Sequence, residues 1–169
     1  PEEFQYLVNR KIKPEEFQYL VNRKIISKNI FIWFVKENNG YGYGIKNCYS
    51  NIIDKYDVIC WTHADGQTPI KDVINAYNIY LKDNKYFDLI KGIRISRKDG
   101  FLSKIFTMFF NLLIFFFLNI RSRSSNSQPT LIKKKFAKLI IPISENNANF
   151  DISVLFHAKK LSLKIKRFP

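Results

Sequence analysis

Short apolar runs alternate with segments of helical periodicity through much of this 169-residue chain, and this order restricts its fold more than any other feature. The runs 57–61 and 88–95 have the length and the residue types of buried strands. Between them, apolar residues recur at helical spacing from Ile70 to Leu81, which predicts an amphipathic helix. Strand, helix and strand in this order predict a crossover between parallel strands. We therefore expect an α/β fold with a mostly parallel sheet and flanking helices.

Further elements are predicted on both sides of this unit. The run 29–35 has the pattern of another buried strand, and the glycine-rich turn 37–44 precedes a helix that should end near Asn51. Toward the C-terminus, apolar spacing predicts a helix over 150–161, and 163–168 should close the fold as a strand. We expect one domain, because 169 residues can bury one hydrophobic core but are few for two.

Polar or glycine-rich segments follow two of the predicted strands. The turn 37–44 follows the first strand, and residues 62–67, which read THADGQ, follow the strand 57–61. In α/β sheets, ligands bind at the carboxyl ends of the strands. These two segments therefore predict a binding site.

The first 28 residues contain a direct duplication. Residues 1–13 read PEEFQYLVNRKIK, and residues 14–26 repeat this sequence with one change. Two copies are too few for a solenoid, which needs at least three stacked units. We therefore separate a duplicated segment, 1–28, without an assigned function, from a domain that covers 29–169.

The formal net charge of +14 favours anionic partners, which include nucleic acid, an anionic membrane surface and phosphorylated ligands. No helix-turn-helix, zinc-finger or RNP signature appears, so we do not expect nucleic acid as a partner. The two cysteines, Cys48 and Cys60, do not form a CxxC pair, which argues against a metal cage or a disulfide framework. With no secretory signal in the sequence, we expect a cytoplasmic protein.

The segment Ile105–Ile120 carries no charge, is rich in Phe, and lies between Lys104 and Arg121. Its 16 residues are fewer than the roughly 20 that a transmembrane helix needs. Three interpretations stay open: a buried core helix, a helix at a membrane interface, and a true transmembrane span.

Five segments resemble family 2 glycosyltransferases of the dolichyl-phosphate-mannose-synthase-like type. WTHADGQT resembles the acidic DxD-type motif of that family, and NNGYGYGI resembles its asparagine–glycine turn. KGIR, NSQPTL and the ending FDISVLFHAKKLSLKIKRFP resemble three further elements in the family's order. These segments lie at 61–68, 38–45, 91–94, 126–131 and 150–169.

The resemblance implies a partial GT-A fold and a hexosyltransferase that uses a nucleotide-sugar donor, with a polyprenyl phosphate or another membrane-linked molecule as the acceptor. It also implies a Mg²⁺ or Mn²⁺ ion, because a hard divalent ion neutralises the charge that grows on a diphosphate leaving group. The implied metal ligands are Asp65 and His63. The alternative for Asp65 is a helix cap before Ile70.

The resemblance implies roles for further residues. Asp151 could deprotonate or position an acceptor hydroxyl, although capping of its helix explains it almost as well. Arg94 could contact a phosphate group or could be a solvated strand end. The residues implied in donor or phosphate binding are Asn39, Gly40, Gly42, Gln67, Arg94 and Gln128.

One part of the family pattern is missing. Family members begin with a strand that reads roughly IPVYNE, followed by a helix and by a second strand that ends in a DDGS-like motif. Residues 1–28 match neither strand. The chain is therefore expected to be a truncated glycosyltransferase domain, and an inactive fragment is one interpretation of it. The alternative is a non-catalytic, basic protein that docks peripherally at the cytoplasmic face of an anionic membrane.

Overall fold

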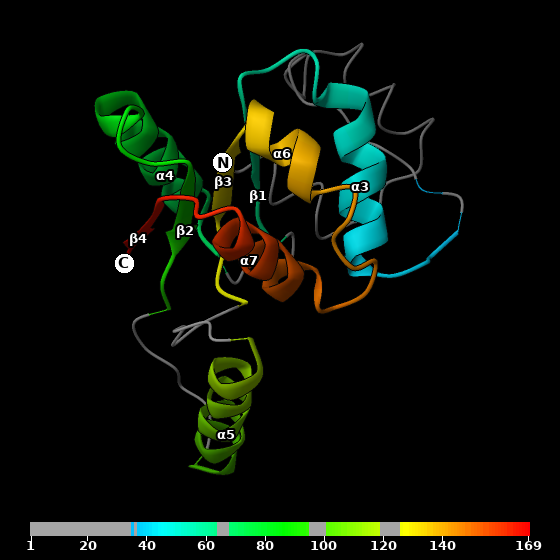
Figure 1. Ribbon diagram of the computed structural model, residues 1–169, viewed down its shortest axis with the longest axis vertical. Coiled ribbons are helices and arrows are strands. Elements are labelled where there is room, and N and C mark those ends of the chain that lie inside the picture. The colour runs from blue at the N-terminus through cyan, green and yellow to red at the C-terminus, as the bar shows by residue number, and fades with distance from the viewer. Residues whose placement is uncertain (1–34, 36, 64–67, 95–100, 119–125) are drawn as a thin grey trace, which may run out of the picture.

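The computed structural model of the protein describes residues 35, 37–63, 68–94, 101–118 and 126–169 (Figure 1). The duplication and nearly all of the expected strand 29–35 lie outside these residues. Five helices and four strands are described. In chain order they are α3 (Tyr41–Ile52), β1 (Val58–Trp61), α4 (Ile70–Asp83), β2 (Leu89–Gly92), α5 (Phe101–Leu118), β3 (Thr130–Lys133), α6 (Lys134–Ile140), α7 (Phe150–Lys160) and β4 (Ile165–Phe168).

The four strands form one sheet in the order β1-β3-β2-β4. β3 is antiparallel to both of its neighbours, and β4 is parallel to β2. β1 and β2 therefore run in the same direction, with α4 as the connection between them. The α/β class is confirmed. The expected mostly parallel sheet does not describe these strands, because β3 enters between β1 and β2 in the opposite direction.

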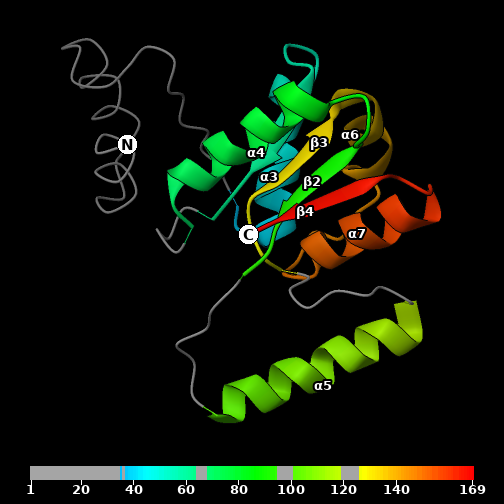
Figure 2. The same ribbon diagram turned by 90° about the vertical axis from the view of Figure 1, so that its left-hand side faces the viewer.

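Helices cover both faces of the sheet (Figure 2). Successive residues of a strand point to opposite faces, so Leu89 packs toward α3, α6 and α7, whereas Ile90 packs toward α4. The larger core lies on the first face and includes Phe150 and Val154 of α7. The smaller core is centred on Ala76 of α4, which is fully buried. This packing places the first turn of α7 against one face of the sheet.

The periodic elements lie close to where the sequence predicts them. β1, α4, α7 and β4 each agree with their predicted ranges to within two residues at either end. Two boundaries differ more. β2 ends at Gly92 rather than Ile95, and α3 begins at Tyr41, inside the expected glycine-rich turn. β3 and α6 were not predicted.

Helix α5 lies apart from the layers around the sheet and beside α7 (Figures 1 and 2). Ile114 is its one buried side chain among those described, and it packs with Ile152 and Leu155 of α7. The interpretation of 105–120 as a buried core helix is therefore wrong for the described residues, because most of the apolar side chains of α5 are exposed. Among the described residues, no helix is both long enough and apolar enough to cross a membrane.

Candidate functional site

A carboxylate is buried where the first turn of α7 meets the sheet. Asp151 is 2% exposed and accepts hydrogen bonds from side chains of four different segments. Trp61 Nε1 at 3.2 Å and Lys91 Nζ at 3.4 Å donate to Oδ1. Gln128 Nε2 at 2.8 Å and the Tyr41 hydroxyl at 3.2 Å donate to Oδ2. This arrangement satisfies a charge that would otherwise be costly to bury.

A second set of hydrogen bonds links these donors to each other. Lys91 Nζ donates to Thr130 Oγ1 at 2.9 Å, and Thr130 Oγ1 donates to Gln128 Oε1 at 3.4 Å. Gln128 Nε2 also donates to the Tyr41 hydroxyl at 3.1 Å. Each hydroxyl therefore donates once and accepts once, which its chemistry allows. We call this network the Asp151 cluster; it consists of Tyr41, Trp61, Lys91, Gln128, Thr130 and Asp151.

The local backbone explains how Gln128 reaches Asp151. The Ser127 hydroxyl donates to the carbonyl of Gly92, and the Gly92 amide donates to Pro129 O at 2.9 Å. These bonds hold the segment before β3 against the end of β2. A side chain at Gly92 would not fit, because its Cβ would lie 2.5 Å from Gln128 O. The glycine after Lys91 therefore allows the two segments to approach.

Lys91 and Asp151 form a buried ion pair, with side chains that are 1% and 2% exposed. Burial lowers the pKa of Lys91, because the charged ammonium loses its hydration, while the charge of Asp151 and its hydrogen bond oppose this shift. Arg167 lowers the same pKa further. Such a pair is strongly coupled, since either charge alone in this position would be unpaired.

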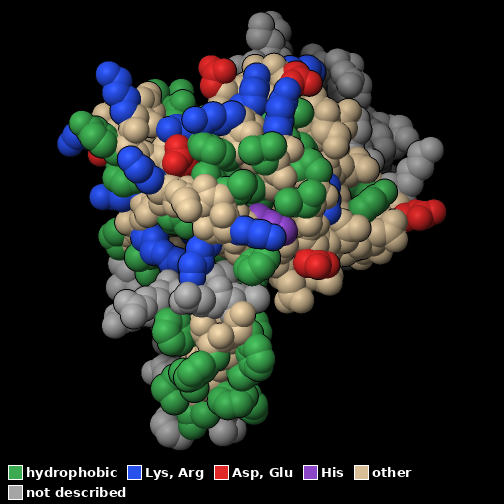
Figure 3. All heavy atoms as spheres, viewed as in Figure 1, with side chains coloured by type: hydrophobic (Ala, Val, Ile, Leu, Met, Phe, Trp, Pro, Cys, Tyr) green, Lys and Arg blue, Asp and Glu red, His purple; other side chains and the backbone are tan. Residues whose placement is uncertain are grey.

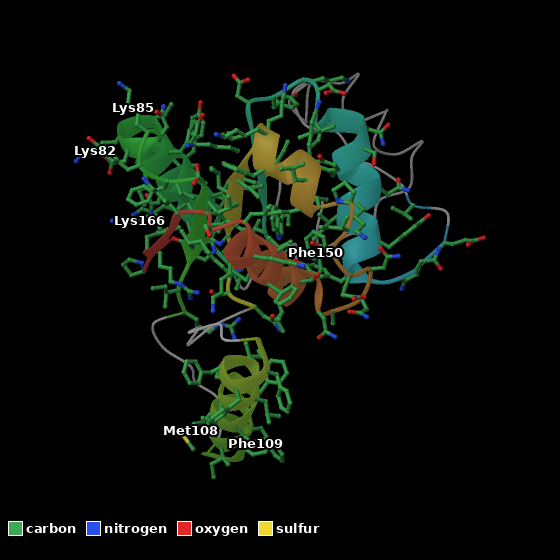
Figure 4. All side chains as sticks on the ribbon, in the orientation of Figure 1. Lys82, Lys85, Met108, Phe109, Phe150 and Lys166 are labelled. Atoms are coloured by element: carbon green, nitrogen blue, oxygen red, sulfur yellow. The ribbon has the colours of Figure 1, made fainter. Side chains whose placement is uncertain are left out.

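The cluster approaches the surface at Tyr41 and His63. Tyr41 is half-buried, and its ring centroid lies 5.5 Å from that of His63. Tyr41 and Trp61 also contact the ring of Phe150 edge-on, at 6.2 and 5.6 Å between centroids; Figure 4 labels Phe150 on α7. Thr62, between Trp61 and His63, has a buried hydroxyl oxygen without a hydrogen-bond partner in the described part of the chain. The carboxyl end of β1 thus combines an aromatic pair with an unsatisfied polar atom.

The structure brings together some of the residues that the sequence predicts. Asp151 and Gln128 are hydrogen-bonded to each other directly, and His63 lies beside the cluster with its ring tilted against that of Tyr41. Asp65 and Gln67 lie outside the described residues. Those two predictions therefore stay predictions, as does the role of His63 as a metal ligand.

Three residues predicted to bind the donor, Asn39, Gly40 and Gly42, lie around the start of α3 and outside the Asp151 cluster. Gly40 has a φ of 103°, and a Cβ there would lie 2.7 Å from Asn146 O. At Gly42, a Cβ would lie 2.9 Å from Phe150 Cβ. These glycines therefore allow α3 to approach α7 and the segment before it, which also carries Tyr41 to Asp151. No contact in the described residues joins Asn39 to the cluster, and Asn39 is exposed.

Arg94 is also exposed, two residues beyond the end of β2. The structure does not place it in the Asp151 cluster, where Lys91 supplies the positive charge instead.

A divalent ion fits the Asp151 cluster poorly. Asp151 is the cluster's only carboxylate, and four donors already occupy its oxygens. Within the described residues, no group of three or more His, Cys, Asp or Glu side chains could hold a metal ion. Of the predicted ligands, His63 is described and Asp65 is not.

Four residues of the cluster were not singled out from the sequence: Tyr41, Trp61, Lys91 and Thr130. Lys91 carried a signal, since it stands in the middle of an otherwise apolar strand and a buried lysine needs a partner. The other three gave no comparable signal, because aromatic and β-branched residues are ordinary in such segments.

No protein-family model matches this chain, and a search of curated proteins gives no match. The function of the chain is therefore inferred from the Asp151 cluster and from the segments that supply it.

Proposed function

We propose that this chain is part of an enzyme that transfers a hexose from a nucleotide-sugar donor to an acceptor hydroxyl or phosphate, and that the Asp151 cluster forms the floor of its active site. One observation carries this proposal. All five segments that resemble glycosyltransferase motifs supply at least one side chain to the cluster. Hydrogen-bonded partners in it are as far as 110 residues apart in the sequence.

The proposal explains why these segments meet. A helix cap at Asp151 would need only local backbone partners, but α7 shows no side-chain cap and Asp151 bonds instead to side chains from the sheet and from α3. A purely apolar contact between α7 and the sheet would be at least as stable as a buried ion pair. A retained polar network of this kind is typical of a site that must hold several side chains in fixed positions.

The geometry favours a positioning role for Asp151. Its oxygens are occupied by four donors, and Tyr41 lies between it and the surface. Asp151 thereby holds the Tyr41 hydroxyl and the Gln128 amide in fixed positions, since both donate to Oδ2. A proton from an acceptor hydroxyl would reach Asp151 through the Tyr41 hydroxyl rather than directly.

The donor would bind on the His63 side of the cluster. We propose that His63 and Asp65 hold a Mg²⁺ or Mn²⁺ ion, which would neutralise the charge on the diphosphate leaving group. The Thr62 hydroxyl, which has no hydrogen-bond partner among the described residues, would be available to a ligand that reaches this end of β1.

Donor binding tests this proposal. The purified chain is titrated with UDP- and GDP-hexoses in a calorimeter, with and without Mn²⁺. We expect binding of at least one donor that depends on Mn²⁺ and is lost in Asp65→Ala. Asp57→Ala is the matched control, because Asp57 is exposed and lies at the other end of β1. Failure of every donor to bind, or equal binding by Asp65→Ala, contradicts the proposal.

A further inference from the structure

Helix α5 exposes an unusual number of large apolar side chains. The most exposed are Phe117 at 83%, Phe106 at 73%, Phe116 at 72% and Met108 at 70%. Figure 4 labels Met108 and Phe109, which lie near the middle of α5. The other exposed apolar residues of α5 are Ile105, Phe109, Phe110, Leu112 and Leu113. Isolated exposed apolar residues are common in proteins, but a continuous surface of this kind marks an interaction site.

The exposed residues cover a wide part of the helix surface. At about 100° per residue, the positions from Met108 through Ile105 to Phe110 span an arc of roughly 200°. The residues outside this arc include Asn111 and Ile114, and Ile114 is the one that packs on α7. A single partner helix covers a much narrower stripe. The width of the arc therefore favours an apolar environment that surrounds more than half of the helix over a single partner helix.

Basic residues lie at and beyond the paired strands β2 and β4, which precede and follow α5 in the chain. The ends of β2 and β4 are paired, with Gly92 opposite Phe168, and α5 begins nine residues after Gly92. Arg94 is exposed beyond the end of β2, and Lys166 lies on β4. In Figure 3, Lys and Arg side chains are spread over the viewed face of the core, whereas the described side chains of α5 are mostly hydrophobic. The charge of the whole chain is +14.

We propose that α5 is a membrane anchor that lies in the interface of an anionic lipid bilayer. Its exposed arc enters the region between headgroups and acyl chains, and its Ile114 side stays on α7. The basic residues at the strand ends then face the anionic headgroups, which adds electrostatic attraction to apolar burial. This docking goes beyond the proposed transfer reaction and does not depend on it.

A second copy of this chain is the other occupant that could cover α5. Two copies paired through α5 would bring their basic faces together, and this repulsion opposes pairing in a chain of charge +14. An anionic surface has the complementary charge. The apolar arc and the charge therefore favour the same occupant.

Vesicle sedimentation tests the proposal. The full chain is mixed with vesicles of phosphatidylcholine alone or with phosphatidylglycerol, and the bound fraction is measured. We expect sedimentation with the phosphatidylglycerol vesicles, weakening as salt screens the charges. In the double variant Phe116→Glu/Phe117→Glu, we expect binding to fall at least about tenfold, because two large apolar side chains become charged. Both positions are exposed, so the variant should still fold.

The matched control is Ile74→Glu/Leu81→Glu on α4, which changes two residues that are 52% and 57% exposed. It should bind vesicles as the unchanged chain does, because α4 covers a different face of the sheet. The proposal is overturned if the unchanged chain does not sediment, or if the α5 variant sediments equally well. A dimer in light scattering that the α5 variant dissociates, without vesicle binding, would assign α5 to a second copy. Equal binding to neutral vesicles would overturn the anionic requirement.

Discussion

The Asp151 cluster and helix α5 depart from the usual distribution of polar and apolar groups in opposite ways. The cluster buries a carboxylate, an ammonium, an amide and hydroxyls, and each has a partner from another segment of the chain. Helix α5 exposes Phe and Met side chains that the described residues leave uncovered. The buried polar groups of the cluster find their hydrogen-bond partners within the fold, whereas the exposed apolar side chains of α5 would need another molecule to cover them. Substitutions in the cluster should therefore change stability, and those on α5 should change binding instead.

Substitution of Lys91 is expected to have the largest effect on the free energy of unfolding. Lys91→Met leaves Asp151 buried without its ionic partner, which should lower the free energy of unfolding by about 3–5 kcal/mol. Urea denaturation followed by circular dichroism measures this change. In Lys91→Met/Asp151→Leu both charges are absent, so much of the loss should be recovered. If the double variant is as unstable as the sum of the two single ones, the two groups are not coupled in the way that the structure indicates.

The next effect is at the contact that brings α3 to α7. Gly42→Ala adds a Cβ that would collide with the backbone oxygen of Glu145 and lie 2.9 Å from Phe150 Cβ, so it should cost about 1–3 kcal/mol through overpacking. Gly44→Ala is the control in the same helix, because a Cβ there meets nothing within 4 Å. It should stabilise the protein by about 0.5–1 kcal/mol. Equal effects of the two changes in thermal unfolding would contradict the close approach of α3 and α7.

A smaller effect is expected at the edge of the cluster. Tyr41→Phe removes the hydroxyl that donates to Asp151 and accepts from Gln128. Because Tyr41 is half-buried, water can replace part of this loss, and the cost should be about 1 kcal/mol. Under the proposed function the same variant should bind the donor normally and transfer the sugar more slowly. A lower donor affinity with an unchanged transfer rate would place Tyr41 in donor binding instead.

The smallest effect on stability belongs to α5. Phe117→Ser changes a side chain that is 83% exposed, so unfolding should shift by no more than about 0.5 kcal/mol. Vesicle binding should nevertheless weaken. A large loss of stability in chemical denaturation would show that Phe117 is covered by the chain itself, and the contrast between the two regions would then fail.

The sequence predicts the periodic elements well because their signal is local. Helix α4 buries a single face against the sheet, and the spacing of its apolar residues records that face. β3 has only four residues and continues directly into α6 at Lys134, so no turn residue separates them. Its place between β1 and β2 depends on pairing across the fold. No local pattern encodes that order.

From the sequence, some residues of the Asp151 cluster could be predicted, but the contacts between them could not. Asp151 and Gln128 were singled out through their segments, but the hydrogen bond between them is a tertiary contact. Lys91 could have been found, since a lysine in a buried strand requires a compensating charge. The glycines at 40 and 42 were predicted to bind a donor, and that role stays a prediction; in the structure they allow α3 to approach α7 and the segment before it. Either role needs the small volume of glycine, so the residue type alone could not distinguish them.

The position of β3 also affects how the chain is made. β1 has its described partner only in β3, and Trp61 pairs with Thr130, roughly 70 residues later. At about 5–20 residues per second, a ribosome needs several seconds to synthesise that interval. During this time the edges of β1 and β2 that pair with β3 are open, and the Phe-rich segment of α5 is synthesised before β3. A nascent chain in this state exposes unpaired strand edges and apolar side chains, both of which promote aggregation. Early contact of α5 with lipid or with a chaperone would therefore protect the chain from aggregation until β3 pairs with β1 and β2.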